Sequence, residues 1–225
     1  MMDDAKKQAA EKAIEFVSDG QIVGLGTGST SKFAIEGLAR RVKEGLNIKG
    51  VATSIATERM ASELGIPITD LNEVSAIDIV IDGADEIDDH FDMIKGGGGA
   101  LTREKLVALA ASRRVYIVDE SKLVQTLGAK WSVPIEVLPF AWRFSSSKLE
   151  ALGCTPRLRE KGDAPYETDN GNYILDCAFG PIEDAPALER QVKLLPGVVE
   201  IGLFIGIANV LIIGGGEQVI VREKG

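Results

Sequence analysis

The feature that most constrains the fold is a regular alternation of short apolar runs with longer segments of helical spacing in the first half of the chain. Parallel strands need a crossover between them, which is usually a helix. This order therefore predicts a parallel sheet with helices on both faces. The expected strands are 21–25, 51–55, 66–68, 76–81 and 115–119, and the expected helices are 3–18, a segment capped by Ser29 or Thr30 and ending at Gly45, 58–64 and 100–112.

From about residue 130 the pattern changes to strand, helix, strand, turn, strand, helix, strand, which is the split β-α-β-β-α-β unit. Its turn is the sequence TDNGN at 168–172, a strong hairpin signal. Two further strands in 209–223, joined by the GGGEQ turn, are expected to return to the first domain. We therefore expect an α/β protein with a Rossmann-like parallel sheet domain, 1–129 with 204–225, and a smaller ferredoxin-like α+β domain, 130–203.

Composition limits the classes of partner. The net charge of −9 argues against nucleic acid, because affinity for it depends on neutralising phosphates. The most apolar run, 201–216, is too short and too interrupted by glycines to span a membrane, and the N-terminus lacks the apolar core of a signal peptide. Cys154 and Cys177 form no CxxC pair and His90 is the only histidine, so we expect no zinc site and a reducing, cytoplasmic location.

Four polar or glycine-rich loops each follow directly after an expected strand. They are GTGST (26–30), DGADE (82–86), KGGGG (95–99) and DESK (119–122). The carboxyl ends of parallel strands meet at one edge of a sheet, where ligands of such folds bind. The sequence therefore predicts a binding site at this edge.

The first loop matches neither the GxGxxG dinucleotide fingerprint nor the P-loop, which requires GK[ST]. It reads as a strand-to-helix turn with hydroxyls at Thr27, Ser29 and Thr30, opening a helix whose N–H groups favour an anion. A tight turn with a simple N-cap fits the same residues.

The second loop places Asp82 at a strand end with Asp85 three residues later. Two close carboxylates can hold different protonation states and pass protons between oxygens. A divalent metal site is the rival interpretation, but the spacing lacks the run of a calcium loop. A solvated acidic loop is the simplest alternative, and we expect Glu86, Asp88 and Asp89 to belong to one.

The remaining loops and the helix that follows KGGGG contain two candidate cations and a candidate base. The glycines after Lys95 would let backbone N–H groups approach a bound oxygen, with the lysine as a point charge. A flexible linker with a solvated lysine is the alternative, but a loop that connects a strand to a helix within one sheet layer is usually short and fixed. Glu104, early in the next helix, is either a proton-abstracting carboxylate or an ordinary exposed helix former, and the sequence leaves its face open. Lys122 is either a phosphate partner or solvated, and His90 is expected to be a loop residue.

Together these stretches resemble the type A ribose-5-phosphate isomerases over nearly the whole chain. The combination DGAD, then KGGG, then REK is specific to that family. The resemblance implies interconversion of D-ribose 5-phosphate and D-ribulose 5-phosphate without metal or organic cofactor. It also implies a homodimer or homotetramer whose partner is a small sugar phosphate.

Residue roles follow from the same resemblance. Glu104 would move a proton between C1 and C2, and Lys95 would stabilise the enediolate. Asp82 and Asp85 would assist ring opening and proton transfer between oxygens. The substrate would be held by loop residues at Thr27, Gly28, Ser29, Thr30, Gly83, Ala84, Gly96, Gly97, Gly98 and Lys122.

Two other classes of protein fit part of this pattern. A CoA transferase-like enzyme could use a carboxylate nucleophile on a similar sheet, but no adenine or pantetheine site is evident and Lys95 would have no task. A non-enzymatic sugar-phosphate sensor would keep the first loop but would not need Glu104.

Overall fold

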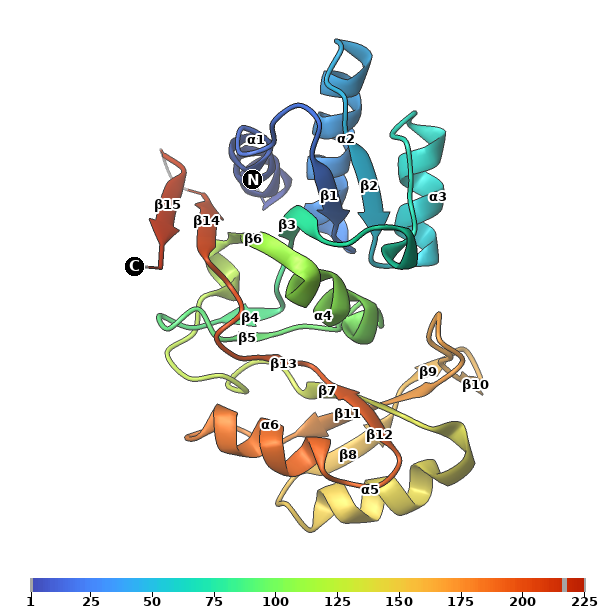
Figure 1. The fold of residues 1–225 in the computed structure, drawn as a ribbon. Helices are drawn as coiled ribbons and strands as arrows, with labels where there is room; N and C mark the ends of the chain where they lie inside the picture. Colours follow the sequence, from blue (N-terminus) through green and yellow to red (C-terminus); the bar gives the residue numbers. More distant parts are fainter. Residues whose placement is uncertain (1, 216–217, 225) are drawn as a thin grey trace. The chain divides into compact units, whose positions relative to one another are not determined.

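The computed structural model describes residues 2–215 and 218–224, and Figure 1 shows the course of the chain. The chain forms two compact units. Unit 1 contains the chain up to Ala84, the segment Arg103–Leu123 and the chain from Ile207 onward. Unit 2 contains Asp85–Thr102 and Val124–Gly206. Each unit is therefore assembled from segments that lie far apart in the sequence.

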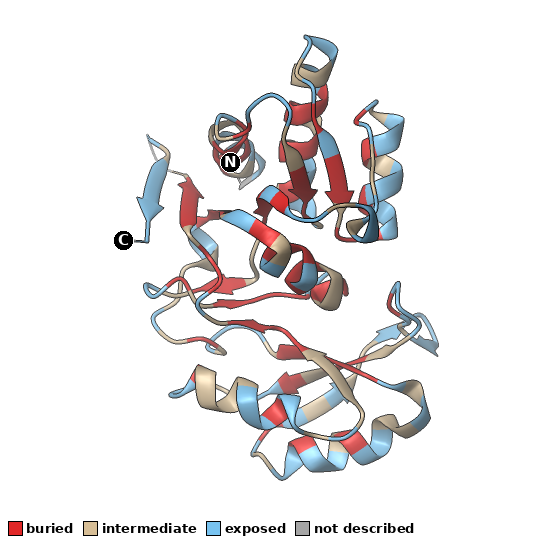
Figure 2. Cartoon of the chain, viewed as in Figure 1, coloured by how far each residue is buried: buried red, intermediate tan, exposed pale blue. Residues whose placement is uncertain are grey.

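Unit 1 is built on a six-stranded sheet in the order β15-β14-β6-β3-β1-β2. Its strands are β1 (Ile22–Leu25), β2 (Lys49–Ala52), β3 (Ile77–Asp82), β6 (Ala111–Asp119), β14 (Val210–Gly214) and β15 (Ile220–Glu223). The pairs from β2 across to β14 are parallel, and the edge strand β15 is antiparallel to β14. Figure 2 shows β14 buried and β15 exposed. The expected parallel sheet is confirmed.

Helices cover both faces of this sheet. They are α1 (Met2–Ile14), α2 (Ser29–Lys43), α3 (Ile55–Glu63) and α4 (Leu101–Ala110), the last beginning in unit 2. Apolar side chains of α1 and α2 share one core with alternate strand residues such as Val23 and Ile79. On the opposite face, a Cβ added to Gly24 would lie 2.7 Å from a methyl of Val107 on α4. Gly24 therefore allows α4 to pack closely on β1.

The expected strand at 66–68 is wrong. This segment makes a single isolated parallel bridge, between Gly50 and Ile68. The N–H of Gly50 donates to the carbonyl of Pro67, but proline has no N–H with which to continue a ladder. A short extended connection follows, ending in the 3-10 turn η1 (Leu71–Glu73).

The cap expected at the start of α2 is also wrong. Gly28 is the N-cap residue, with φ of 110°, and no side chain bonds back to the helix start. Ser29 is already helical. A φ in this range favours glycine, so Gly28 takes the cap position. Ser29 and Thr30 then follow it as the first residues of the helix.

Other boundaries differ as well. α1 ends at Ile14, and β6 starts at Ala111, where its pairing with β3 begins. The expected strand 51–55 ends already at Ala52, because Ser54 caps α3 and Ile55 is its first residue.

Unit 2 contains a four-stranded antiparallel sheet in the order β12-β7-β11-β8. Its elements are β7 (Val133–Val137), η3 (Pro139–Ala141), α5 (Trp142–Glu150), β8 (Thr155–Leu158), β11 (Tyr173–Ala178), α6 (Ala185–Lys193) and β12 (Val198–Ile201). The chain order and the strand order are those of the predicted split β-α-β-β-α-β unit. Both helices contribute to one apolar core on the same face of the sheet, through Leu149 of α5 and Val192 of α6.

Unit 2 also holds smaller sheets. The pair β9 (Glu160–Lys161) and β10 (Ala164–Pro165) forms one, and β4 (Glu86–Ile87), β5 (Met93–Ile94) and β13 (Leu203–Phe204) form another. The pairing of β5 with β13 places 85–102 in unit 2, whereas the sequence assigned it to the first domain. The domain boundaries expected from the sequence thus differ from the compact units at 85–102, and also at 124–129 and 204–206, which lie in unit 2.

The C-terminal strands β14 and β15 join the sheet of unit 1, as the sequence predicted. The expected GGGEQ turn between them includes residues 216 and 217, which lie outside the described residues. Across the described ranges, no helix combines the length and apolar character that a membrane crossing requires.

Candidate active site

The predicted loops of unit 1 lie at the carboxyl edge of its sheet. Strand β1 pairs with β2 on one side and with β3 on the other, so the order in which strands are added reverses between β1 and β3. Ligands of open α/β sheets bind beside such a reversal. The Gly26–Gly28 turn follows β1, Asp82 ends β3, and Lys122 follows β6 in the 3-10 turn η2 (Glu120–Lys122).

Asp82 is held at the end of β3 by backbone and side-chain donors. Its Oδ1 accepts hydrogen bonds from the N–H of Thr27 at 3.1 Å, the hydroxyl of Ser31 at 3.0 Å and the N–H of Gly83 at 2.8 Å. A Cβ at Gly26 would overlap this carboxylate, so the turn needs glycine there. The half-buried Gly83 and Ala84 continue the chain into β4. The aspartate is therefore fixed at the sheet edge.

The Thr27 hydroxyl belongs to a cluster that sequence reasoning missed. It lies 2.8 Å from the hydroxyl of Thr53, 2.9 Å from that of Ser54 and 3.1 Å from that of Thr57. Ser54 also accepts the N–H of Thr57 and caps α3. The cluster anchors the turn after β1 to the start of α3. The expected strand VATSI contained two of these residues, but nothing in their spacing indicated the contact.

The start of α2 is arranged to receive an anion. Its cap residue Gly28 and its first residue Ser29 are exposed, and the first turn holds no acidic side chain. The first N–H groups of a helix lack partners within the helix and carry partial positive charge. Lys6 on α1 donates to the Ser29 hydroxyl at 3.0 Å, which brings an ammonium group to this end. Sequence reasoning did not single out Lys6.

Glu104 lies in the first turn of α4 and is only 4 % exposed. The sequence left open which face of the helix Glu104 occupies, and the structure places it on a buried face. Lys122 is half-buried at the carboxyl end of β6. Asp119 caps the turn that carries it by accepting the N–H of Ser121 at 3.0 Å.

In unit 2, Lys95 is buried just after β5. It is 3 % exposed, its ammonium lies 5.5 Å from the centroid of the Phe204 ring, and its N–H donates to the carbonyl of Gly202 at 2.9 Å. The backbone contact extends the pairing of β5 with β13. A lone lysine is usually solvated, and this one is not.

Asp85 and the glycine turn are joined by a hydrogen bond. The Gly97 N–H donates to Asp85 Oδ2 at 2.7 Å. A Cβ at Gly97 would lie 2.7 Å from the other oxygen of that carboxylate, so the position requires glycine. Gly96 has φ of 100°, and its added Cβ would lie 2.8 Å from Leu101. The turn is therefore a fixed structure, and a flexible linker is excluded.

The acidic residues after Asp85 differ from expectation in one case. Glu86 was expected to be solvated, but it is fully buried and accepts the N–H groups of Gly128 at 2.6 Å, Lys130 at 2.6 Å and Trp131 at 2.7 Å. Its partners lie more than forty residues away, which the local sequence could not show. Asp88 is half-buried, and burial raises its pKa.

His90 is an exposed loop residue, as predicted, and Asp89 is exposed as well. Asp88 accepts the N–H of His90 at 2.8 Å and stabilises the loop. Within residues 2–215 and 218–224, no group of three or more His, Cys, Asp or Glu side chains is arranged to hold a metal ion.

A second buried carboxylate that sequence reasoning missed is Glu136 on β7. It is fully buried and accepts from Thr168 Oγ1 at 2.9 Å, Asn170 Nδ2 at 3.1 Å and Asn172 Nδ2 at 2.8 Å, all in the TDNGN turn. It also accepts from the hydroxyl of Thr102, on the first turn of α4. The turn was predicted, but its buried partner was not.

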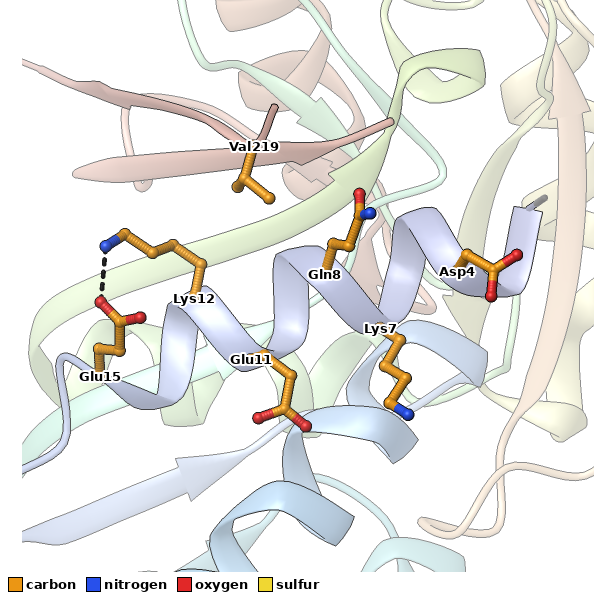
Figure 3. A pocket seen from close by; sticks show the side chains of 7 residues that line it. All are labelled: Asp4, Lys7, Gln8, Glu11, Lys12, Glu15 and Val219. Atoms are coloured by element: carbon orange, nitrogen blue, oxygen red, sulfur yellow. Dashed lines mark hydrogen bonds and ion pairs between the residues drawn. The ribbon is translucent and has the colours of Figure 1, made fainter. Parts of the chain in front are cut away.

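A shallow hollow of about 430 Å³ lies beside α1 in unit 1 (Figure 3). Its lining is mostly charged, and Lys12 pairs with Glu15 at 2.6 Å within it. None of the predicted site residues lines it. The lining residues are Asp4, Lys7, Gln8, Glu11, Lys12, Glu15 and Val219.

The fold is that of an α/β protein. In unit 1 the carboxyl edge of the sheet carries a fixed aspartate and an anion-favouring helix start, and in unit 2 a fixed glycine turn is hydrogen-bonded to a second aspartate. The chain belongs to the family of ribose 5-phosphate isomerase A (phosphoriboisomerase A), whose model matches residues 49–218. It is 48 % identical over 220 residues to ribose-5-phosphate isomerase A of Sphingopyxis alaskensis, covering 98 % of this chain and 96 % of that protein.

Solved structures agree with this assignment. Ribose 5-phosphate isomerase A from Methanocaldococcus jannaschii has a TM-score of 0.94 and 40 % identity, covering 98 % of this chain and 99 % of that one. A D-ribose-5-phosphate isomerase in complex with phospho-erythronic acid has a TM-score of 0.97 and 41 % identity, covering the whole of both chains. The expected α/β fold class is confirmed.

Proposed function

We propose that this chain interconverts D-ribose 5-phosphate and D-ribulose 5-phosphate through an enediolate. The observation that carries the proposal is the 48 % identity to a ribose-5-phosphate isomerase A over 98 % of the chain. Supporting it, the residues that the family motif assigns to chemistry are buried or hydrogen-bonded here, although charged side chains are mostly exposed in proteins.

Glu104 is the proposed base. Moving the carbonyl between C1 and C2 requires a group that removes a proton from the carbon beside it and returns it to the neighbouring carbon. A carboxylate shielded from water suits this task, because desolvation makes it a stronger base. Glu104 is 4 % exposed, and α4 is a rigid element on which to hold it.

Lys95 and the two aspartates are proposed to manage charge and protons on oxygen. The ammonium of Lys95 would stabilise the negative oxygen of the enediolate, which is usually the largest contribution to such catalysis. Asp82 and Asp85 are each fixed by backbone N–H donors, which keeps their oxygens in a defined direction. They would take part in ring opening and in moving a proton between O1 and O2.

The phosphate is proposed to bind at the start of α2, with Lys122 as a further cation. The exposed Gly28 and Ser29, the N–H groups of the first turn and the ammonium of Lys6 provide donors and positive charge. Binding the phosphate would position the reacting carbons, which lowers the entropic cost of the chemical step. Thr30 and the exposed Gly97 and Gly98 would contact the remaining substrate oxygens.

The test is an assay of the purified protein with ribose 5-phosphate in excess EDTA. We expect turnover at the same rate as without EDTA, because Lys95 supplies the electrophile that a metal would otherwise provide. A panel of other aldose phosphates gives the substrate range. Phospho-erythronic acid, which a structural relative binds, should inhibit competitively. Absence of turnover with ribose 5-phosphate would refute the proposed function, and binding without turnover would favour a sensor.

The family resemblance further supports a homodimer or homotetramer in the cytoplasm. Cys154 and Cys177 are free thiols, which is usual for a reducing compartment. Light scattering coupled to size-exclusion chromatography would give the mass in solution, and a mass of 24.0 kDa would exclude an oligomer under those conditions.

A further inference from the structure

The glycine turn after Lys95 is braced by two side chains of unit 2. The Gly99 N–H donates to the Gly96 carbonyl at 3.0 Å and closes the turn, and both residues have positive φ, 84° and 100°. Gly97 and Gly98 form its exposed tip. Glycine has no side chain to restrict its backbone, so the geometry of this turn depends on contacts from outside it.

Arg159 supplies the main contact. Its Nη1 donates to the carbonyl of Gly96 at 2.9 Å and to that of Gly97 at 3.1 Å. Its Nε donates to Asp176 Oδ2 at 2.9 Å, and its Nη2 donates to the other oxygen of the same carboxylate. Asp176 lies on β11, so the guanidinium is held between a rigid strand and the turn.

The surroundings of Arg159 are equally fixed. Its N–H donates to the carbonyl of Ile174 and its own carbonyl accepts the N–H of Tyr166, both at 2.8 Å. The Tyr166 ring centroid lies 5.9 Å from the guanidinium, and the hydroxyl donates to the carbonyl of Gly98 at 3.3 Å. Burial raises the pKa of Tyr166, so this hydroxyl stays protonated at neutral pH. Three successive carbonyls of the turn therefore accept from these two side chains.

These contacts determine where the N–H groups of the turn point. In a planar trans peptide the C=O and the N–H point in opposite directions. The Gly96 carbonyl faces Arg159, and the N–H of the same peptide, on Gly97, donates to Asp85 at 2.7 Å. The Gly97 carbonyl also faces Arg159, so the N–H of Gly98 at the exposed tip points away from it.

We propose that Arg159 is a positioning residue for the isomerisation. Through one peptide it fixes the carboxylate of Asp85, and through the next it aims the Gly98 N–H at an oxygen of the sugar phosphate. This inference rests on the proposed function. The positive charge at the carbonyls also polarises both peptides and makes their N–H groups stronger donors.

Lysine could not replace this arginine. The arrangement uses three nitrogens of one planar group, two for Asp176 and one for the two carbonyls. Lysine has a single nitrogen on a flexible chain and can hold either the carboxylate or the turn. The conservative substitution is therefore itself a test of the geometry.

The experiment compares Arg159→Ala and Arg159→Lys with Arg157→Ala. Arg157 is exposed, lies on β8 opposite Asp176, and its loss changes the net charge equally. We expect kcat to fall about tenfold to a hundredfold in both Arg159 variants, the loss typical of a misplaced catalytic group, with KM changed far less. Added guanidinium should restore part of kcat in Arg159→Ala only. Hydrogen exchange of the 96–98 amides should rise in that variant and not in Arg157→Ala.

The outcomes separate the two proposals. An inactive wild-type protein would overturn the proposed function, and the positioning role with it. An active wild type with kcat in Arg159→Ala within twofold of Arg157→Ala would overturn the positioning role alone. If Arg159→Ala does not fold, Arg159→Lys decides, and a folded, fully active Arg159→Lys would overturn the role. A loss of activity without guanidinium rescue and without faster exchange at 96–98 would mean a merely structural role.

Discussion

Three charged side chains proposed for catalysis are almost completely shielded from water. Asp82 is 2 % exposed, Lys95 3 % and Glu104 4 %. Removing a charge from water costs several kcal/mol unless partners compensate, and exposed positions were available for all three residue types. Burial alone does not identify a catalytic residue, because Glu86 and Glu136 are also fully buried and serve the structure through their hydrogen bonds. Burial does distinguish the three proposed residues from exposed acids and lysines, and the family motif separates them from the structural carboxylates.

Replacing Glu104 with Gln tests the base. The amide keeps the shape but cannot accept the proton, so kcat should fall about a hundredfold to ten-thousandfold, with substrate affinity within a few fold. Steady-state kinetics and calorimetric titration measure the two effects. The matched control is Glu58→Gln, an exposed acid in the first turn of α3, which loses the same helix-dipole interaction. Wild-type activity in Glu104→Gln would rule out the assignment.

Replacing Lys95 with Ala tests the electrophile. We expect kcat to fall on the order of a hundredfold or more, because the ammonium would act on charge that develops in the transition state. Lys161→Ala, at an exposed position on β9, carries the same charge change and should leave kcat unaltered. A change confined to KM would show that Lys95 only anchors the substrate.

At the residue scale, the sequence predicted those candidate site residues that belong to a recognisable local motif. Asp82 and Lys95 stand beside glycines in loops after strands, which is a local signal. Arg159 gave no such signal, because its partners Gly96 and Gly97 lie more than sixty residues away. Glu86 was wrongly predicted to be solvated for the same reason, because the N–H groups that bind its carboxylate lie more than forty residues away.

At the scale of elements, Glu136 ties together parts that the sequence treated as independent. Its carboxylate accepts from Thr168, Asn170 and Asn172 of the hairpin turn and from Thr102 on α4. A buried carboxylate with several donors is strongly stabilised as a group, and each donor would lose a partner without it. The turn residues therefore supply hydrogen bonds to β7 as well as the geometry of the turn.

Replacing Glu136 with Gln tests this link. The amide presents an NH₂ to groups that donate, so we expect the free energy of unfolding to fall by about 1.5–3 kcal/mol, the range of hydrogen bonds to a charged group. Urea denaturation measures it. Glu160→Gln, exposed on β9, should change stability by less than about 0.5 kcal/mol. Equal stabilities of the two variants would show that the network contributes nothing.

Helices and strands were predicted correctly where the hydrophobic periodicity was strong. They were missed where a strand forms only by pairing with a distant part of the chain. The runs that became β3, β6 and β14 are strongly apolar because they are buried centrally in the sheet. The two-residue strands β5 and β13 have no periodicity to detect, and their pairing assigns 85–102 to unit 2. The apolar run at 66–68 contains Pro67, which has no N–H to donate, so its pairing with β2 stops at a single bridge.

At the scale of the whole molecule, the chain must bind an anion although its net charge is −9. A field of that sign does not attract a sugar phosphate at long range. Affinity must then come from local groups, and unit 1 gathers them at one end of its sheet, with the start of α2, Lys6 and Lys122. The amino end of the same sheet offers a natural comparison, because Lys49 is exposed there at the start of β2.

Replacing Lys122 with Ala should therefore raise KM for ribose 5-phosphate several-fold while kcat changes little, because a group that holds the phosphate binds ground state and transition state alike. Inorganic phosphate should compete with the substrate in the wild type more effectively than sodium chloride at the same ionic strength, which separates site binding from screening. Phosphate should compete more weakly in Lys122→Ala, whereas Lys49→Ala, with the same charge change at the opposite edge, should match the wild type. Equal KM values in the two variants would place the phosphate away from Lys122, and a fall in kcat alone would give this lysine a part in the chemical step.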